Sequence, residues 1–132
     1  MLDVHDLRVG NILALIGEEM ITPSPIVAID EIGLVHLEGM DYPENIDNMV
    51  GVPFQSGFLV EKLQEVNSAR KLGMFISLVV KGDNIIHSVN IEFHGTFIKE
   101  CFFIHELQNT MIDLVGIDPY ASLSHKSKEN QL

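Results

Sequence analysis

The segment IIHSVNIEF at residues 85–93 carries the clearest structural pattern in the chain. Apolar and polar side chains alternate along it, with the period of two that is typical of a strand with one buried face. Residues 81–84, Lys-Gly-Asp-Asn, form a predicted turn before it, and Gly95 ends it. The pattern predicts a strand of an antiparallel sheet. We expect Val89, Ile91 and Phe93, with His87 at the same parity, to face inward, and Ser88, Asn90, Glu92 and His94 to face outward.

Five further apolar stretches predict strands around this segment. Pro23 and Pro25 interrupt one of them and confine it to a sheet edge or mark its beginning, because proline cannot donate to a ladder. Residues 38–49 are polar and predict a surface loop. The five predicted strands are residues 9–16, 21–29, 32–37, 74–80 and 96–101.

Two helices are predicted by apolar residues at helical spacing. The first covers residues 56–67 with Ser56 as its N-cap, and the second covers residues 102–115 with Gly116 at its C-cap position. Together the elements predict an α+β fold, a small antiparallel sheet of about six strands with two packed helices. Residues 1–121 form a single predicted domain, and residues 122–132 form a polar, mobile tail.

The predicted core collects the apolar positions of these elements. A chain of 132 residues buries about two-thirds of its unfolded surface, which is enough for a core without disulfides. The expected core residues are Leu13, Ile29, Leu59, Leu63, Ile76, Leu78, Val89, Ile91, Phe93, Ile104, Leu107, Met111 and Leu114.

Composition excludes several classes of protein. With 46% apolar residues the chain is too apolar for a disordered protein, and its single cysteine cannot form a disulfide framework. No apolar run approaches the roughly 20 residues that span a membrane. Asp3 and Asp6 stand where a secretory signal carries basic residues, so export is not expected. We therefore expect a soluble cytoplasmic domain.

The formal net charge of −11 arises almost entirely from the first half of the chain. Up to Val60 there are ten acidic residues and one base, Arg8, whereas from Glu61 onward nine acidic residues stand against seven basic ones. Such a surface repels phosphate backbones, so direct nucleic-acid binding is not expected. It fits either solubility or an acidic mimic of nucleic acid, and the spacing of the acids in pairs favours solubility.

The sequence lacks the common catalytic and cofactor signatures. It has no P-loop, GxGxxG, GxSxG, HExxH or CxxC motif. Cys101 stands between Glu100 and two phenylalanines, an environment that raises the pKa of a thiol rather than activating it. Glu92 and His94 share a predicted strand face and could supply two metal ligands, but a solvent-facing polar face explains them as well. We expect no catalytic residue, no cofactor and no metal site.

The second predicted helix carries the candidate binding residues. His105, Asn109 and Ile112 project opposite its apolar stripe, and Gln108 lies at the boundary. An apolar Ile112 beside polar neighbours predicts a covered second face and hence a homo-oligomer, most simply a twofold dimer. Arg8 joins the set because an isolated arginine can hold an anionic group. The candidate ligand or partner contacts are Arg8, His105, Gln108 and Asn109.

Each of these residues also has a structural explanation. Arg8 can balance a nearby aspartate, and such exposed pairs contribute little. Gln108 and Asn109 can tie loop backbone to the helix through a polar network that fixes the topology. Gly10, beside Arg8, suits a positive φ or a close backbone approach.

Three segments together resemble a known family. Leu7-Arg8-Val9-Gly10-Asn11 is similar to an LRxGN opening, residues 52–63 to a middle IxLTxxxLxKL segment, and residues 103–116 to a closing VHxLQNxxxxLTG segment. In this order they resemble a family of small uncharacterised proteins of Bacteroidetes and their phages and prophages. The middle segment departs, with Gln55-Ser56-Gly57 where the family has a threonine and an acid. The resemblance implies a small α+β fold, a mobile-element context and a bacterial cytoplasm, and it supplies no activity.

These observations favour a non-enzymatic accessory protein of a phage or mobile element. Such a protein would bind a host protein or sequester a small anionic, nucleotide-type ligand. The alternative is a structural or assembly protein of a phage particle, and a second alternative is an acidic nucleic-acid mimic. No membrane association is expected.

The purified protein is expected to carry no stoichiometric zinc or iron. Glu92 and His94 are the pair with ligand-like spacing, and two protein ligands seldom hold a metal alone. Elemental analysis checks this expectation, and about one metal ion per chain would contradict it.

Overall fold

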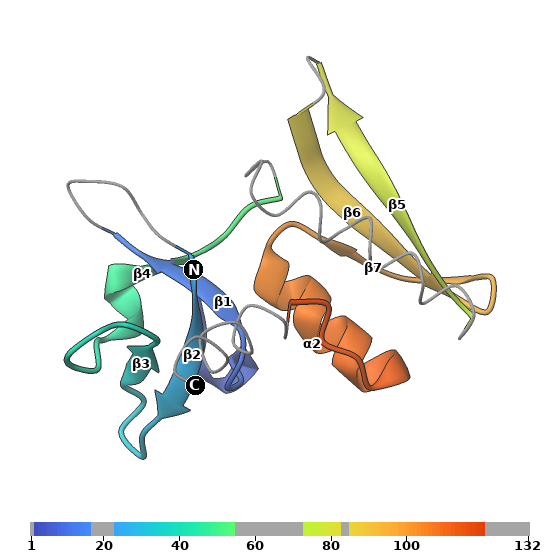
Figure 1. Cartoon of the computed structure of the whole chain (residues 1–132). Coiled ribbons are helices and arrows are strands. Elements are labelled where there is room, and N and C mark those ends of the chain that lie inside the picture. Colours follow the sequence, from blue (N-terminus) through green and yellow to red (C-terminus); the bar gives the residue numbers. More distant parts are fainter. Residues whose placement is uncertain (1, 17–22, 55–72, 83–84, 121–132) are drawn as a thin grey trace, which may run out of the picture. The chain divides into compact units, whose positions relative to one another are not determined.

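The computed structural model describes residues 2–16, 23–54, 73–82 and 85–120 (Figure 1). The chain divides into two compact units. The first comprises Met1–Val52 and Ala121–Leu132, and the second comprises Pro53–Tyr120. In its described part each unit contains one antiparallel sheet, four-stranded in the first and three-stranded in the second.

The sheet of the first unit has the strand order β3-β2-β1-β4, and all its neighbouring strands are antiparallel. The 3₁₀ turns η1 and η2 come before β1 and β4 in the chain. Leu13, in β1, pairs with Ser24 on one side and Gly51 on the other. The elements are η1 (Val4–Asp6), β1 (Ile12–Leu15), β2 (Ser24–Ile29), β3 (Val35–Leu37), η2 (Ile46–Asn48) and β4 (Met49–Gly51).

A cluster of buried apolar side chains from these strands and the preceding segment forms the core of the first unit. Leu13 is fully buried, as predicted, and Ile29 is partly buried against the cluster. The predicted turn at Asp30 is confirmed, because its carboxylate accepts the N–H groups of Ile32 at 3.0 Å and Leu34 at 2.9 Å. The core cluster is Leu7, Leu13, Ile26, Val35, Leu37 and Met49.

The segment before β1 is a structural turn. The Asn11 side chain is buried, and its Oδ1 accepts the Arg8 N–H at 2.8 Å. Gly10 has a φ of 98°, and its N–H donates to the Ile26 carbonyl at 2.8 Å. The predicted positive φ at Gly10 is therefore confirmed, since an L side chain rarely adopts that conformation. Within the LRxGN-like opening, Gly10 thus joins the turn to β2 through its hydrogen bond to Ile26.

Two expectations about this unit need correction. Pro25 lies in β2, which is an interior strand, so the edge-strand alternative is wrong and Pro25 instead marks the beginning of the strand. Proline is tolerated at the beginning of a strand, and the Pro25 carbonyl accepts the Glu38 N–H at 2.9 Å. The polar stretch 38–49 is not loop throughout, since it contains η2 and its last residue begins β4. A three-residue strand that depends on pairing with β1 leaves little trace in local periodicity.

The sheet of the second unit has the strand order β5-β6-β7. β5 (Met74–Lys81), β6 (Ile85–Phe93) and β7 (Thr96–Cys101) match the predicted strands closely. His94 and Gly95 have φ values of 51° and 83°, and they link β6 to β7. Two successive left-handed residues are the geometry of a type I′ hairpin turn, which suits the twist of the flanking strands.

A β-bulge shifts the alternation of β6 at His87. Val79 pairs with Ser88 and Val80 with Ile86, so His87 is the extra residue. Ile86 and Val89 are consequently both buried although three residues apart. The expected orientations are wrong here: His87 is exposed, and Ser88 is fully buried with its hydroxyl donating to Glu100 Oε2 at 2.5 Å. Beyond the bulge, Val89 and Ile91 are buried as predicted.

The helix α2 (Ile104–Val115) follows β7 directly (Figure 1). Glu106 Oε1 accepts the backbone N–H groups of Phe102 at 2.8 Å and Phe103 at 3.0 Å, which is the acidic half of a capping box. Gly116 ends the helix with a φ of 73°, and its N–H donates to the Ile112 carbonyl at 3.0 Å. The predicted helix and its glycine C-cap are therefore confirmed.

The described residues have an α+β fold, as predicted, with a different arrangement of strands. Seven strands form two sheets instead of about six strands forming one, and α2 is the α-helix of the described ranges. The predicted helix at 56–67 and the tail at 122–132 lie outside the described residues. No helix among the described residues is long and apolar enough to cross a membrane.

Most of the predicted core residues in the described ranges are buried or half-buried. Leu78 is the exception at 46% exposed. Ile76, Phe93 and Leu114 are half-buried. Leu59 and Leu63 lie outside the described residues. The fully or almost fully buried members of the second unit are Val89, Ile91, Ile104, Leu107 and Met111.

Leu107→Ala is expected to lower the free energy of unfolding by about 2–5 kcal/mol, because the side chain is 0% exposed and its removal leaves a cavity. Urea denaturation measures the change. Leu78→Ala is the matched control, with an expected loss below about 1 kcal/mol because this leucine is partly solvated. Equal losses in the two variants would contradict the helix phase.

Candidate functional site

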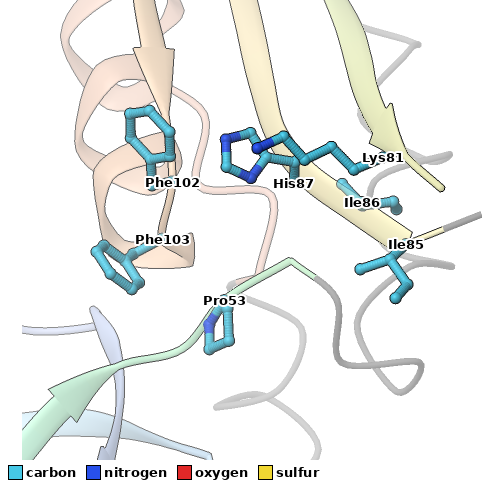
Figure 2. A pocket seen from close by; sticks show the side chains of 7 residues that line it. All are labelled: Pro53, Lys81, Ile85, Ile86, His87, Phe102 and Phe103. Carbon is cyan, nitrogen blue, oxygen red and sulfur yellow. The ribbon is translucent and has the colours of Figure 1, made fainter.

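An open pocket of about 410 Å³ lies within the second unit. Figure 2 shows Phe102 and Phe103 on one side of it, Ile85 and Ile86 on the other, and Lys81 and His87 together at one end. The lining residues come from the chain before β5, from the β5–β6 hairpin and from the β7–α2 junction. The described lining residues are Pro53, Lys81, Ile85, Ile86, His87, Phe102 and Phe103.

The aromatic side of the pocket is held by the start of α2. Phe102 and Phe103 occupy the two positions between β7 and the helix, and both of their N–H groups bind the Glu106 carboxylate. Phe103 also forms an isolated antiparallel bridge with Pro53, which brings the other end of the pocket into place. The two rings remain 39% and 40% exposed although their backbone is fixed. They therefore present a pre-positioned aromatic surface to a ligand.

His87 reaches the pocket because it is the bulged residue of β6. Its ring meets Phe102 edge to face, with centroids 5.5 Å apart and an interplanar angle of 82°. Bulges recur next to functional sites because they redirect one side chain out of the strand alternation. The bulge thus places an imidazole against the aromatic side of the pocket.

The polar side chains of the described residues that line the pocket are basic or neutral. They are the Lys81 ammonium and the His87 imidazole. None of the acidic residues in the described part of the second unit lines the pocket. These acidic residues are Glu92, Glu100, Glu106, Asp113 and Asp118. An apolar pocket with one ammonium and one imidazole can hold a flat apolar group and an anion at the same time.

The candidate residues predicted from the sequence do not line this pocket. His105 is 8% exposed and contacts a lining residue, with its ring stacked on that of Phe103 at a centroid distance of 6.0 Å and an interplanar angle of 15°. Gln108 is fully buried and Asn109 is half-buried on the same helix. Arg8 is an exposed residue of the first unit. Of the four predicted site residues, His105 contacts a residue that lines the pocket, and Arg8, Gln108 and Asn109 are not among the lining residues.

The buried face of α2 is wider than predicted. Burial extends over Ile104, His105, Leu107, Gln108 and Met111, so His105 and Gln108 belong to the buried side rather than to an opposite or boundary position. Ile112 is half-buried. At 100° per residue, Gln108 falls 40° from Ile104, inside the apolar stripe. The twofold dimer that Ile112 led us to expect stays a prediction.

Gln108, within α2, connects the helix to the loop that follows it. Its Nε2 donates to Asp118 Oδ1 at 3.1 Å and to Oδ2 at 3.3 Å, and Oδ1 also accepts the Tyr120 N–H at 2.8 Å. The amide thus joins α2 to the loop that follows it. This contact matches the structural explanation for the LQN segment, in which a buried polar side chain fixes the loop.

Cys101 is the free thiol of the chain and is fully buried. Burial raises the pKa of this thiol to about 11, although the Thr110 hydroxyl, 4.0 Å from the sulfur, acts in the opposite direction. At neutral pH the group is a thiol rather than a thiolate, so it is a poor nucleophile. Burial also raises the pKa of Tyr120.

The metal-like spacing of Glu92 and His94 does not persist in the fold. His94 lies in the hairpin turn with a positive φ, and its ring is 4.2 Å from that of Phe93. Strand alternation therefore does not extend from Glu92 to His94, and the expectation that they share a face is wrong. Within the described ranges no three His, Cys, Asp or Glu side chains gather as metal ligands.

Sequence reasoning missed the pocket residues because they are far apart in the chain. Pro53, the β5–β6 hairpin and Phe102–Phe103 come together through the fold alone. A weak signal existed in two consecutive phenylalanines placed directly before a helix, where large apolar residues are harder to bury. Searches with protein-family models, curated proteins and solved structures find no match to this chain.

Gln108→Ala and Asp118→Ala are each expected to lower the free energy of unfolding by about 1–3 kcal/mol, because each removes a hydrogen-bond partner of a buried or half-buried polar side chain. The double variant should lose less than the sum of the two by at least about 0.5 kcal/mol, since the Gln108 amide donates to the Asp118 carboxylate and the two residues are coupled. Urea denaturation of the three variants provides the cycle. Additive losses would show that this hydrogen bond does not stabilise the fold.

Proposed function

We propose that the protein is a non-enzymatic binding module that sequesters a small anionic ligand in the pocket between the β5–β6 hairpin and the start of α2. The observation that carries this proposal is the pocket lining, in which Lys81 and His87 are the polar residues and no described acidic side chain takes part. In a chain of net charge −11, a pocket with this local balance favours an anion.

The dimensions and chemistry of the pocket support a small molecule. Ligand pockets commonly measure about 300–1,000 Å³ and combine apolar walls with a few polar groups, and 410 Å³ falls in the lower part of this range. Five of the seven described lining residues are apolar. Burial of an apolar part of the ligand would supply affinity, and the ammonium group would select for negative charge.

Binding rather than catalysis fits the groups present. A nucleophile needs an adjacent base or a lowered pKa, and the buried Cys101 thiol has a raised one. Lys81 and His87 can bind and orient a ligand, and the described lining residues include no Ser, Thr, Cys, Asp or Glu to act with them. These features support a role in holding a ligand unchanged.

The wider context of the proposal comes from the sequence. Similarity of the opening and closing segments to proteins of Bacteroidetes and their phages supports an accessory role for a phage or mobile element in a bacterial cytoplasm. A nucleotide-type signal is the kind of small anion that such a protein could withdraw from its host. We also propose that the chain forms a twofold homodimer around Ile112. A host protein is the alternative partner to a small anionic ligand.

Native mass spectrometry tests the proposal. After incubation with a small-molecule extract of bacterial cells, the protein is expected to carry a ligand that is released on denaturation. Lys81→Glu should lose this ligand, because it reverses the charge at the pocket. Arg8→Glu is the matched control, since Arg8 is an exposed basic residue of the first unit that does not line the pocket, and this variant should retain the ligand. A wild-type protein without ligand, or equal occupancy in both variants, would contradict the proposal.

A further inference from the structure

We infer that the ligand class of this pocket is a nucleoside monophosphate, whose base lies on the Phe102–Phe103 side and whose single phosphate meets Lys81 and His87. This inference rests on the proposed function and makes it specific. It follows from two features of the lining: aromatic rings held ready for stacking, and a cationic end with room for one anionic group.

The aromatic side is built to accept a planar ring. Phe102 and Phe103 are each about 40% exposed, and the rings of His87 and Phe102 already meet edge to face at a centroid distance of 5.5 Å. His105 stacks on Phe103 at an interplanar angle of 15° and supports that ring from the helix. Stacking of a base on an aromatic side chain is worth about 1–3 kcal/mol. A ring-bearing ligand therefore gains affinity that an aliphatic phosphate does not.

The rings need little reorganisation to bind. Glu106 Oε1 accepts the N–H groups of both phenylalanines, and Pro53 bridges the backbone of Phe103. Ligand affinity improves when a site is already ordered, because less conformational entropy is lost on binding. Glu106 is thus a positioning residue, and its carboxylate is directed to backbone rather than to the ligand.

The cationic end matches one phosphate rather than several. Lys81 ends β5 opposite Ile85, and His87 stands at the bulge beside it (Figure 2). The Lys81 ammonium supplies one positive charge and the His87 imidazole supplies one hydrogen-bonding group, and together these suit a single phosphate. Lys99, the other lysine in the described part of the second unit, lies 3.8 Å from Glu106 and does not line the pocket. A triphosphate would place further negative charge where the described lining has no further cation.

Isothermal titration calorimetry with defined probes tests the inference. The probes are the four ribonucleoside 5′-monophosphates, and the comparison compounds are the matching nucleosides, ribose 5-phosphate and the triphosphates. At least one monophosphate is expected to bind tenfold or more tightly than its nucleoside and than ribose 5-phosphate, and more tightly than its triphosphate. Tenfold corresponds to one charge-assisted contact or one stacked ring.

Paired variants assign the two halves of the ligand. Phe102→Leu keeps an apolar side chain but removes the ring, and it should weaken monophosphate binding about tenfold without affecting ribose 5-phosphate. Phe97→Leu is its control, since Phe97 is 58% exposed on β7 and outside the pocket. Lys81→Gln should weaken monophosphate binding about tenfold and leave nucleoside binding unchanged, with Arg8→Gln in the first unit as its control. Circular dichroism confirms that each variant is folded.

The outcomes separate this inference from the proposed function. If ribose 5-phosphate binds as tightly as every monophosphate, or if a triphosphate binds best, the ligand class is wrong although a small anion is still bound. If no monophosphate binds but native mass spectrometry finds a ligand that depends on Lys81, the inference fails and the proposed function stands. If neither experiment finds a ligand, both fail.

Discussion

The carboxylate of Glu106 is the contact on which the second unit depends most. It accepts two adjacent backbone N–H groups, those of Phe102 and Phe103, at the point where β7 ends and α2 begins. Hydrogen bonds to a charged acceptor are stronger than neutral ones, and a negative charge in the first turn is also favourable for the helix. The same contact therefore starts the helix, sets its phase and directs two aromatic side chains outward. Burial of Leu107 and Met111 follows from that phase.

The bulge at His87 is the second constraint that shapes the pocket. A regular strand from Ile85 to Phe93 would place His87 on the face of Val89 and Ile91, among buried residues. The extra residue lets Ile86 remain buried while His87 turns toward Phe102. The bulge leaves His87 outside the regular pairing of β5 and β6. The same residue makes the edge-to-face ring contact with Phe102. The pocket thus depends on an irregularity of β6 and on the regular start of α2 together.

Local pattern was sufficient for some elements of this fold and insufficient for others. The strand at 85–93 and the helix ending at Gly116 were predicted closely, because period-two alternation and a glycine C-cap act over a few residues. β4 was missed because three residues become a strand only through pairing with β1. The division of strands between two sheets likewise depends on long-range pairing that periodicity does not encode.

The candidate site was predicted less well than the fold, for a related reason. His105 and Gln108 drew attention as polar residues in an apolar neighbourhood, and both are buried. Gln108 joins α2 to the loop that follows it, whereas the His105 ring stacks on that of Phe103. Lys81, His87 and Phe102 were not singled out because their chemistry depends on proximity, and proximity arises from the hairpin and the bulge.

Net charge and local charge point in opposite directions in this protein, and distance decides which governs binding. The net charge of −11 repels an approaching anion, but at physiological salt a charge more than about 8 Å away is largely screened. Within the pocket, Lys81 and His87 act at contact distance, where screening is weak and the surrounding side chains are apolar. In the proposed complex, acidic residues beyond this distance would slow the encounter more than they weaken binding. The nearby Glu106 carboxylate is balanced by two backbone N–H groups and by Lys99. Selectivity of the proposed site would then depend on matching the ligand to the few described groups at the pocket, a ring for Phe102 and Phe103 and one anionic group for Lys81.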